Sequence, residues 1–187
     1  MTRFYRAAWL FYLFLSIAGL VGLAALGRPV DLRLFVEGGS WWLDLALGLG
    51  AGALLLALWA LARSRLASAR ELERTLGALV GRLGGEEVVA LALISAIGEE
   101  VAFRGALQGW LGLWPAAALF ALLHVGPGAT FRPWTRFALA GGVVFGLLVD
   151  QRGSLGAAIV AHLAVNLVQL RRIARLSPVA SGEPPND

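Results

Sequence analysis

The sequence predicts an all-α membrane protein, a polytopic bundle of about six transmembrane helices. Hydrophobic residues make up 58% of the 187 positions and charged residues only 15%, which is little charge for a soluble domain of this length. Apolar runs that approach or exceed the roughly 20 residues needed to cross a bilayer recur along the chain, and short arginine clusters separate them. These observations favour one helical domain embedded in the lipid bilayer.

The charge and cysteine content exclude several kinds of site. All 16 basic residues are arginine, and the formal net charge is +4. Because the arginines flank apolar runs, they fit the orientation of membrane helices, and no nucleic-acid partner is predicted. The chain has no cysteine, which excludes disulfides, thiolate metal sites and cysteine nucleophiles.

Residues 1–86 are expected to form two transmembrane helices and an interfacial helix. The apolar run at 5–26 is longer than the core of a signal peptide, so a retained span is favoured. The second run, at 41–62, begins with two tryptophans, which are common at membrane interfaces. Glycines at 50–52, like those at 141–146 further on, are expected to mark close helix packing.

Residues 63–87 contain the pattern of an interfacial amphipathic helix. Leucines, among them Leu79, recur there at three- to four-residue spacing, and the opposite face is expected to carry charged residues that include Glu73. A solvated connecting helix is the alternative interpretation.

Residues 87–170 are expected to form a core of four shorter spans, which glycines and prolines separate. The spans lie at about 88–110, 114–125, 137–149 and 155–170. The second and third are short for independent membrane helices, so bundle packing must complete them. Residues 171–187 begin with a basic cluster and are expected to end as a disordered tail.

The distribution of arginine predicts the orientation of the spans. An even number of spans places both termini on one side, and that side receives twelve arginines against three on the other. The positive-inside rule therefore predicts cytoplasmic termini. The composition, rich in arginine, alanine and leucine without lysine, is typical of a bacterial protein, so the bacterial inner membrane is the expected location.

The segment ISAIGEEVAFRGAL places Glu99, Glu100 and Arg104 inside the first of the shorter spans. A charge at the centre of a membrane helix costs about 3 kcal/mol, so these groups need partners or a wet cavity. Glu100 and Arg104 are four residues apart and can pair along one helical face. Glu99 points about 100° away and is left to face another helix.

The chain has two histidines, one in FALLH, which ends at His124, and one in HLAVN, which begins at His162. The four-residue spacing places Phe120 beside His124 and His162 beside Asn166. Taken alone, a Glu–Arg pair, a histidine or an asparagine inside a membrane helix is more often a structural polar contact than a catalytic group. Together they indicate an acid, two imidazoles and an amide around one cavity, with Glu99 as the acid.

Such a set can hydrolyse a peptide bond without a covalent intermediate and without a cofactor. A carboxylate can act as general base toward a water molecule that a neighbouring imidazole holds and polarises. A second imidazole and an amide can donate hydrogen bonds to the oxyanion of the tetrahedral intermediate.

The motifs together resemble the CPBP family, the CAAX protease and bacteriocin-processing (Abi) family, which includes type II CAAX prenyl endopeptidases. EEVAFR, ending at Arg104, is similar to the family's EExxxR motif, and FALLH is similar to FxxxH. GSL at 153–155 followed by HLAVN is similar to the closing segment. The resemblance covers about 87–170 and implies a CAAX-protease-like core and an intramembrane glutamate protease.

The resemblance also implies residue roles. Glu99 would be the general base, His124 would position the attacking water with it, and His162 and Asn166 would stabilise the oxyanion. Supporting roles are implied for three residues of the motifs, Glu100, Arg104 and Phe120.

The implied substrate is a membrane-embedded or lipid-proximal peptide or protein. For a bacterial chain, a leader peptide, a bacteriocin precursor or a C-terminal sorting helix is expected. As a short chain with a bacterial composition, the sequence also resembles the sorting branch of the family, called myxosortases.

Three alternatives stay open. A zinc-dependent intramembrane protease could use the histidines and a glutamate as ligands, but no HExxH motif is present and metal-free hydrolysis is favoured. A non-catalytic membrane scaffold or bacteriocin-immunity factor would not need Glu99. A proton-coupled transporter could use a Glu–His relay, but no inverted repeat is evident.

The depth of the expected site follows from helix geometry. Glu99 lies about 18 Å along an ideal helix from the expected cytoplasmic end of its span, whereas His124 lies near that end of its own span. The two residues can meet only if the span tilts or begins deeper, or if water enters from one face. A cavity in the cytoplasmic half is therefore expected.

Overall fold

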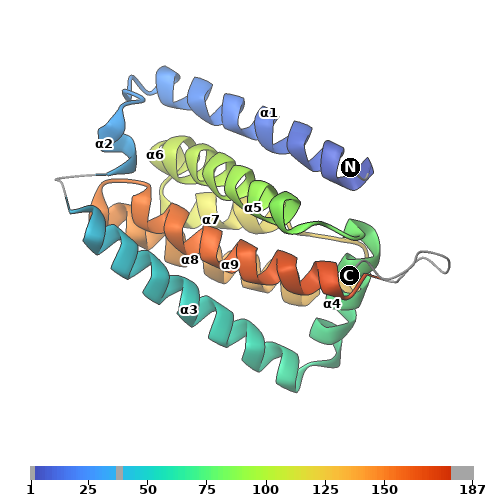
Figure 1. Cartoon of the computed structure of the whole chain (residues 1–187). Helices are drawn as coiled ribbons and strands as arrows, with labels where there is room; N and C mark the ends of the chain where they lie inside the picture. Colours follow the sequence, from blue (N-terminus) through green and yellow to red (C-terminus); the bar gives the residue numbers. More distant parts are fainter. Residues whose placement is uncertain (1–2, 37–39, 178–187) are drawn as a thin grey trace.

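The computed structural model describes residues 3–36 and 40–177, which form a bundle of helices with no strand in these ranges (Figure 1). The predicted all-α fold is thereby confirmed. The elements are α1 (Arg3–Ala25), α2 (Leu32–Phe35), α3 (Trp41–Arg65), α4 (Ala67–Val80), α5 (Gly85–Glu100), the π-helical turn η1 (Val101–Leu107), α6 (Gln108–Leu111), α7 (Leu113–Leu122), the 3-10 turn η2 (Ala129–Phe131), α8 (Arg132–Arg152) and α9 (Gly156–Arg175).

Three of the described helices, α1, α3 and α9, are long and apolar enough to cross a membrane. The expected count of six spans is therefore not confirmed by length and composition. The other expected spans correspond to α5 with η1 and α6, to α7 and to α8. They fall short because α5 gives way to a π-helical turn beside its buried charges, α7 has only 10 residues, and α8 begins and ends with charged residues.

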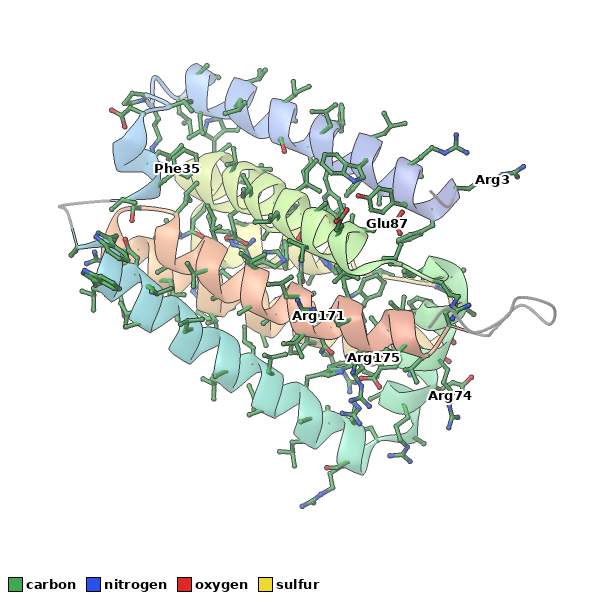
Figure 2. All side chains as sticks on the ribbon, in the orientation of Figure 1. Arg3, Phe35, Arg74, Glu87, Arg171 and Arg175 are labelled. Atoms are coloured by element: carbon green, nitrogen blue, oxygen red, sulfur yellow. The ribbon has the colours of Figure 1, made fainter. Side chains whose placement is uncertain are left out.

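The long segments run back and forth, and both ends of the described chain lie at the same end of the bundle (Figure 1). Figure 2 shows Arg3, Arg74 and Arg175 at this end. The expected basic tail begins inside a helix, because α9 continues through Arg175. Its remainder, residues 178–187, lies outside the described residues.

Contacts between distant segments define the bundle. Helix α3 packs along α9, α7 packs along α8, and α1 packs on α5 and η1. Glycine permits some of these close approaches, as expected: a Cβ on Gly52 would lie 3.1 Å from the carbonyl oxygen of Ala161, and a Cβ on Gly142 would lie 3.2 Å from Ala117. Gly50, in contrast, has nothing within 4 Å of the Cβ position.

The amphipathic helix is α4, and its inward face differs from the expected one. Glu73, expected on the charged outer face, is only 3% exposed, because the Trp59 indole nitrogen donates to its carboxylate at 2.9 Å and Arg172 Nε at 3.0 Å. Leu79, expected on the apolar face, is 59% exposed. The prediction was wrong here because a carboxylate with buried donors can replace a leucine on the inward face.

Candidate active site

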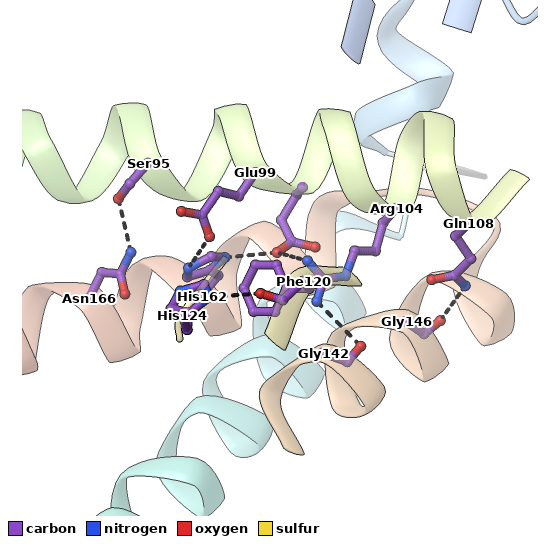
Figure 3. A network of polar contacts seen from close by, with 11 residues as sticks. Ser95, Glu99, Arg104, Gln108, Phe120, His124, Gly142, Gly146, His162 and Asn166 are labelled. Carbon is purple, nitrogen blue, oxygen red and sulfur yellow. Dashed lines mark hydrogen bonds and ion pairs between the residues drawn. The ribbon is translucent and has the colours of Figure 1, made fainter. Parts of the chain in front are cut away.

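The polar residues singled out in the sequence lie on α5, η1, the end of α7 and α9, and Figure 3 shows their side chains converging between these elements. Glu99 is 4% exposed and Glu100 is 0% exposed. Arg104 and His162 are also buried. The bundle therefore gathers several ionisable side chains in its interior.

Glu100 stands at the centre of the network. Its Oε1 atom accepts a hydrogen bond from Arg104 Nη1 at 3.1 Å, which confirms the predicted intrahelical ion pair. The same oxygen lies 2.7 Å from Nδ1 of His162, a contact that the spacing did not reveal. Glu100 thus links the arginine of its own helix to the histidine of α9.

His162 lies between the two glutamates. Because Glu100 Oε1 already accepts from a guanidinium, Nδ1 of His162 is the donor in their contact. Nε2, the other ring nitrogen, lies 3.6 Å from Glu99 Oε2. The Phe145 ring stacks on the imidazole at a centroid distance of 4.9 Å, which fixes its plane. His162 therefore presents Nε2 to Glu99.

His124 follows the last turn of α7 and keeps a helical contact to it. Its Nδ1 lies 2.8 Å from the backbone carbonyl oxygen of Phe120. A carbonyl oxygen only accepts, so Nδ1 carries the proton and Nε2 of the neutral ring carries the lone pair. The edge of Trp134 packs against this ring at 5.2 Å. The histidine is thereby held in one tautomer with Nε2 free to accept.

Asn166 lies one turn after His162 on α9 and is bonded to a residue that the sequence reasoning missed. Its Nδ2 donates to Ser95 Oγ at 2.9 Å, and Ser95 Oγ donates in turn to the carbonyl oxygen of Ala92. Ser95 precedes Glu99 by four residues, so the same i, i+4 spacing could have identified it. An amide nitrogen has two protons, and the second remains for another acceptor.

Arg104 is enclosed by aromatic rings and backbone. The guanidinium carbon lies 4.2 Å from the centroid of the Phe120 ring and 5.3 Å from that of Phe145. Its Nη2 also donates to the carbonyl oxygen of Gly142 at 3.3 Å. Arg104 belongs to η1, and single π-helical turns are frequent at functional sites. The Phe120 ring contacts the guanidinium of Arg104 and also the imidazole ring of His124.

Two cavities meet at these residues. The larger, of about 470 Å³, is lined by Glu99 and His124 and by residues near both chain ends, including Phe4 and Ile173. A smaller one, of about 150 Å³, is lined by Glu99 and His124 together with His162 and Asn166. The larger cavity thus lies toward the end of the bundle that holds both ends of the described chain. Glu99 and His124 line the same two cavities, despite their different expected depths.

The zinc alternative would need the two histidines and a glutamate to hold one ion. Within residues 3–36 and 40–177, no group of three His, Cys, Asp or Glu side chains is arranged to hold a metal ion. Nδ1 of His162 is engaged by Glu100 and Nδ1 of His124 by a backbone carbonyl, so a metal ion would have to bind the two Nε2 atoms.

Residues 86–168 match the model of a family described as type II CAAX prenyl endopeptidase Rce1-like. This segment of the chain is similar to that family. It runs from α5 into α9 and contains the EExxxR, FxxxH and HxxxN motifs, so the predicted resemblance is confirmed. The Rce1-like segment and the three apolar helices together identify an integral membrane protein.

A curated protein also matches part of the chain. YpbD of Bacillus subtilis (strain 168), an uncharacterized protein, is 34% identical over 83 residues, which are 43% of this chain and 42% of YpbD. The chain therefore matches less than half of the length of this relative. No solved structure matches the chain.

Helix α1, outside the Rce1-like segment, brings one further residue to the site. Tyr12 lines both cavities together with Glu99, and its backbone carbonyl lies against Gly98, the neighbour of Glu99. Nothing in the sequence could have identified this contact, because the two residues belong to different helices.

Proposed function

We propose that the protein is an intramembrane endopeptidase that hydrolyses a peptide bond of a membrane-associated protein or peptide precursor. The observation that carries the proposal is the position of Glu99 in the Rce1-like segment. Among the described residues, its Oε2 atom is buried without a hydrogen-bond partner, in a cavity wall shared with both histidines. A carboxylate oxygen so placed suits a general base acting on a bound water molecule.

In the proposed reaction, Glu99 takes a proton from water while the water oxygen attacks the carbonyl carbon of the peptide bond. Nε2 of His124 accepts the second proton of that water in a hydrogen bond and so orients it. When the tetrahedral intermediate collapses, the carbon–nitrogen bond breaks and the proton held by Glu99 passes to the leaving nitrogen. The products are a carboxylic acid and an amine, and transfer of the acid's proton to the amine gives a carboxylate and an ammonium group.

The oxyanion is proposed to receive hydrogen bonds from His162 and Asn166. Donation from Nε2 of His162 requires a second proton on this ring, since Nδ1 already donates to Glu100. Asn166 has a second amide proton beyond the one that it donates to Ser95. Preorganised donors of this kind act strongly in a dry site.

Glu100, Arg104 and Phe120 are proposed to support the site through His162. Glu100 holds the imidazole at 2.7 Å, and Arg104 holds Glu100 at 3.1 Å. The Phe120 ring packs against the guanidinium and both imidazole rings. Through these contacts Glu100 supports the proposed oxyanion donor.

We further propose that 87–170 forms the catalytic core, to which the helices of 1–86 are added. The proposed location is the bacterial inner membrane with cytoplasmic termini, since both described ends lie together with exposed arginines. The larger cavity would then open toward the cytoplasmic half. The mostly apolar lining of this cavity fits a membrane-embedded or lipid-proximal substrate.

The test compares the termini of membrane proteins between cells that express the wild-type chain and cells that express Glu99→Gln. Processing should fall by about 100-fold or more at the affected precursor, because a positioned general base contributes on this scale. Glu86→Gln, an exposed change on the same helix, is the matched control and should process normally. Undiminished processing by Glu99→Gln, with both proteins inserted at equal levels, would refute the proposal and favour the scaffold.

A further inference from the structure

We propose that Tyr12 of α1 is a positioning residue for Glu99, so that a helix outside the Rce1-like segment completes the active site. The inference rests on the proposed function, and it concerns a residue that none of the motifs contains. Its basis is a close contact between two helix backbones at Glu99, together with the polar side chains of α1.

Helix α1 approaches α5 and η1 at backbone distance on either side of Glu99. A Cβ on Gly98 would lie 2.7 Å from Ser16 Oγ and 3.1 Å from the carbonyl oxygen of Tyr12. A Cβ on Gly19 would lie 2.8 Å from the Cα atom of Ala102. Small residues therefore fix the position of α1 where Tyr12 passes Glu99.

The polar side chains of α1 also point to this contact. Between residues 10 and 25, Tyr12 and Ser16 are the only side chains with a hydrogen-bonding group. They lie one turn apart, and Ser16 Oγ donates to the carbonyl oxygen of Tyr12 at 2.7 Å. In an otherwise apolar stretch of helix, a hydroxyl in the same cavity as a buried carboxylate indicates a specific role.

The hydroxyl is suited to orient the carboxylate. Tyr12 and Glu99 line the same two cavities, and a phenol hydroxyl can donate to a carboxylate oxygen. A hydrogen bond from the α1 side to one oxygen would leave the other, Oε2, facing Nε2 of His162 at 3.6 Å. The carboxylate then reaches the water with a single orientation, which is the effect expected of a positioning residue.

Infrared spectroscopy of the full chain in lipid bilayers tests the contact without a substrate. The carboxyl band of Glu99 is assigned as the band lost in Glu99→Gln. Tyr12→Phe removes one hydroxyl and should shift this band. Tyr5→Phe makes the same change at the only other tyrosine, on the same helix and outside both cavities, and should leave the band in place.

A reciprocal measurement leaves Tyr12 itself unchanged. In a Tyr5→Phe background, Tyr12 is the only tyrosine, so its phenol carbon–oxygen band can be read directly. Adding Glu99→Gln should shift that band. Unshifted bands in both measurements would overturn the inference, even if Tyr12→Phe accumulates poorly.

The kinetic test uses the precursor whose processing Glu99→Gln abolishes. Tyr12→Phe should lower kcat by about 10- to 100-fold with little change in KM, because positioning acts on the chemical step. Tyr5→Phe should match the wild type. A shifted band with unchanged kcat would overturn the positioning role. Normal processing by Glu99→Gln would instead overturn the proposed function and this inference together.

Discussion

Replacing Arg104 with methionine should destabilise the protein strongly, because the change leaves a buried carboxylate without its cation. Glu100 and Arg104 have side-chain exposures of 0% and 1%, and their charged atoms lie 3.1 Å apart. The substitution also removes the bond to the Gly142 carbonyl and the contact with the Phe120 ring. Breaking a buried pair from one side typically costs about 3 to 5 kcal/mol, and that loss is expected here.

The double variant Glu100→Gln/Arg104→Met separates the effect of charge from that of packing. It removes both charges, and glutamine keeps an oxygen that can accept from Nδ1 of His162. Since the charge of Glu100 is removed together with that of its cation, the double variant should recover at least about 1 to 2 kcal/mol of the loss. The matched surface control is Arg74→Met, whose ion pair with Glu71 has exposures of 72% and 58%, and whose effect should stay within about 0.5 kcal/mol.

Equilibrium unfolding in mixed micelles of a mild detergent and sodium dodecyl sulfate provides the measurement, with tryptophan fluorescence as the signal from the chain's 7 tryptophans. The midpoints of Arg104→Met, the double variant and Arg74→Met are compared with the wild type. If Arg104→Met unfolds at the midpoint of Arg74→Met, or if the double variant is less stable than the single one, the reasoning about the buried charge is refuted.

Two further predictions concern helix packing. Glu73→Ala should loosen α4 and speed proteolysis between residues 63 and 87. The Trp59 indole and Arg172 lose their buried acceptor, so the free energy of unfolding should fall by about 1 to 3 kcal/mol. The exposed Glu71→Ala is the control, and equal cleavage of the two variants would contradict the role of Glu73. Gly19→Ala should lower the free energy of unfolding by about 1 to 3 kcal/mol, and with it the unfolding midpoint, since the new Cβ would lie 2.8 Å from backbone atoms of Ala102. Gly50→Ala, the control, meets nothing within 4 Å and should be neutral.

Local spacing was sufficient for the predictions that the structure confirms. The Glu100–Arg104 pair joins residues four apart on one helix, so ordinary helix geometry predicted it. The helical class followed from apolar runs of suitable length, and the family resemblance followed from short motifs read in order. Each of these features depends on residues within a few turns of one another.

The tertiary structure decided which residues meet across helices. The sequence placed Glu100 with Arg104 alone, yet packing of α9 against α5 also brings His162 to Glu100, 62 positions away. It likewise brings Asn166 to Ser95, 71 positions away. Glu73 turns inward for the same reason, since its donors come from α3 and α9.

The physical reason is the character of the helices themselves. A helix that is apolar on nearly every side, as α5 is before Glu99, contains no periodic signal for the face that turns inward. Its rotation is set by the fit against its neighbours, such as the contact of Gly98 with Ser16 and Tyr12. The sequence alone therefore determined the fold class and the ionisable groups of the site, and close helix packing decided how Glu99 is oriented among them.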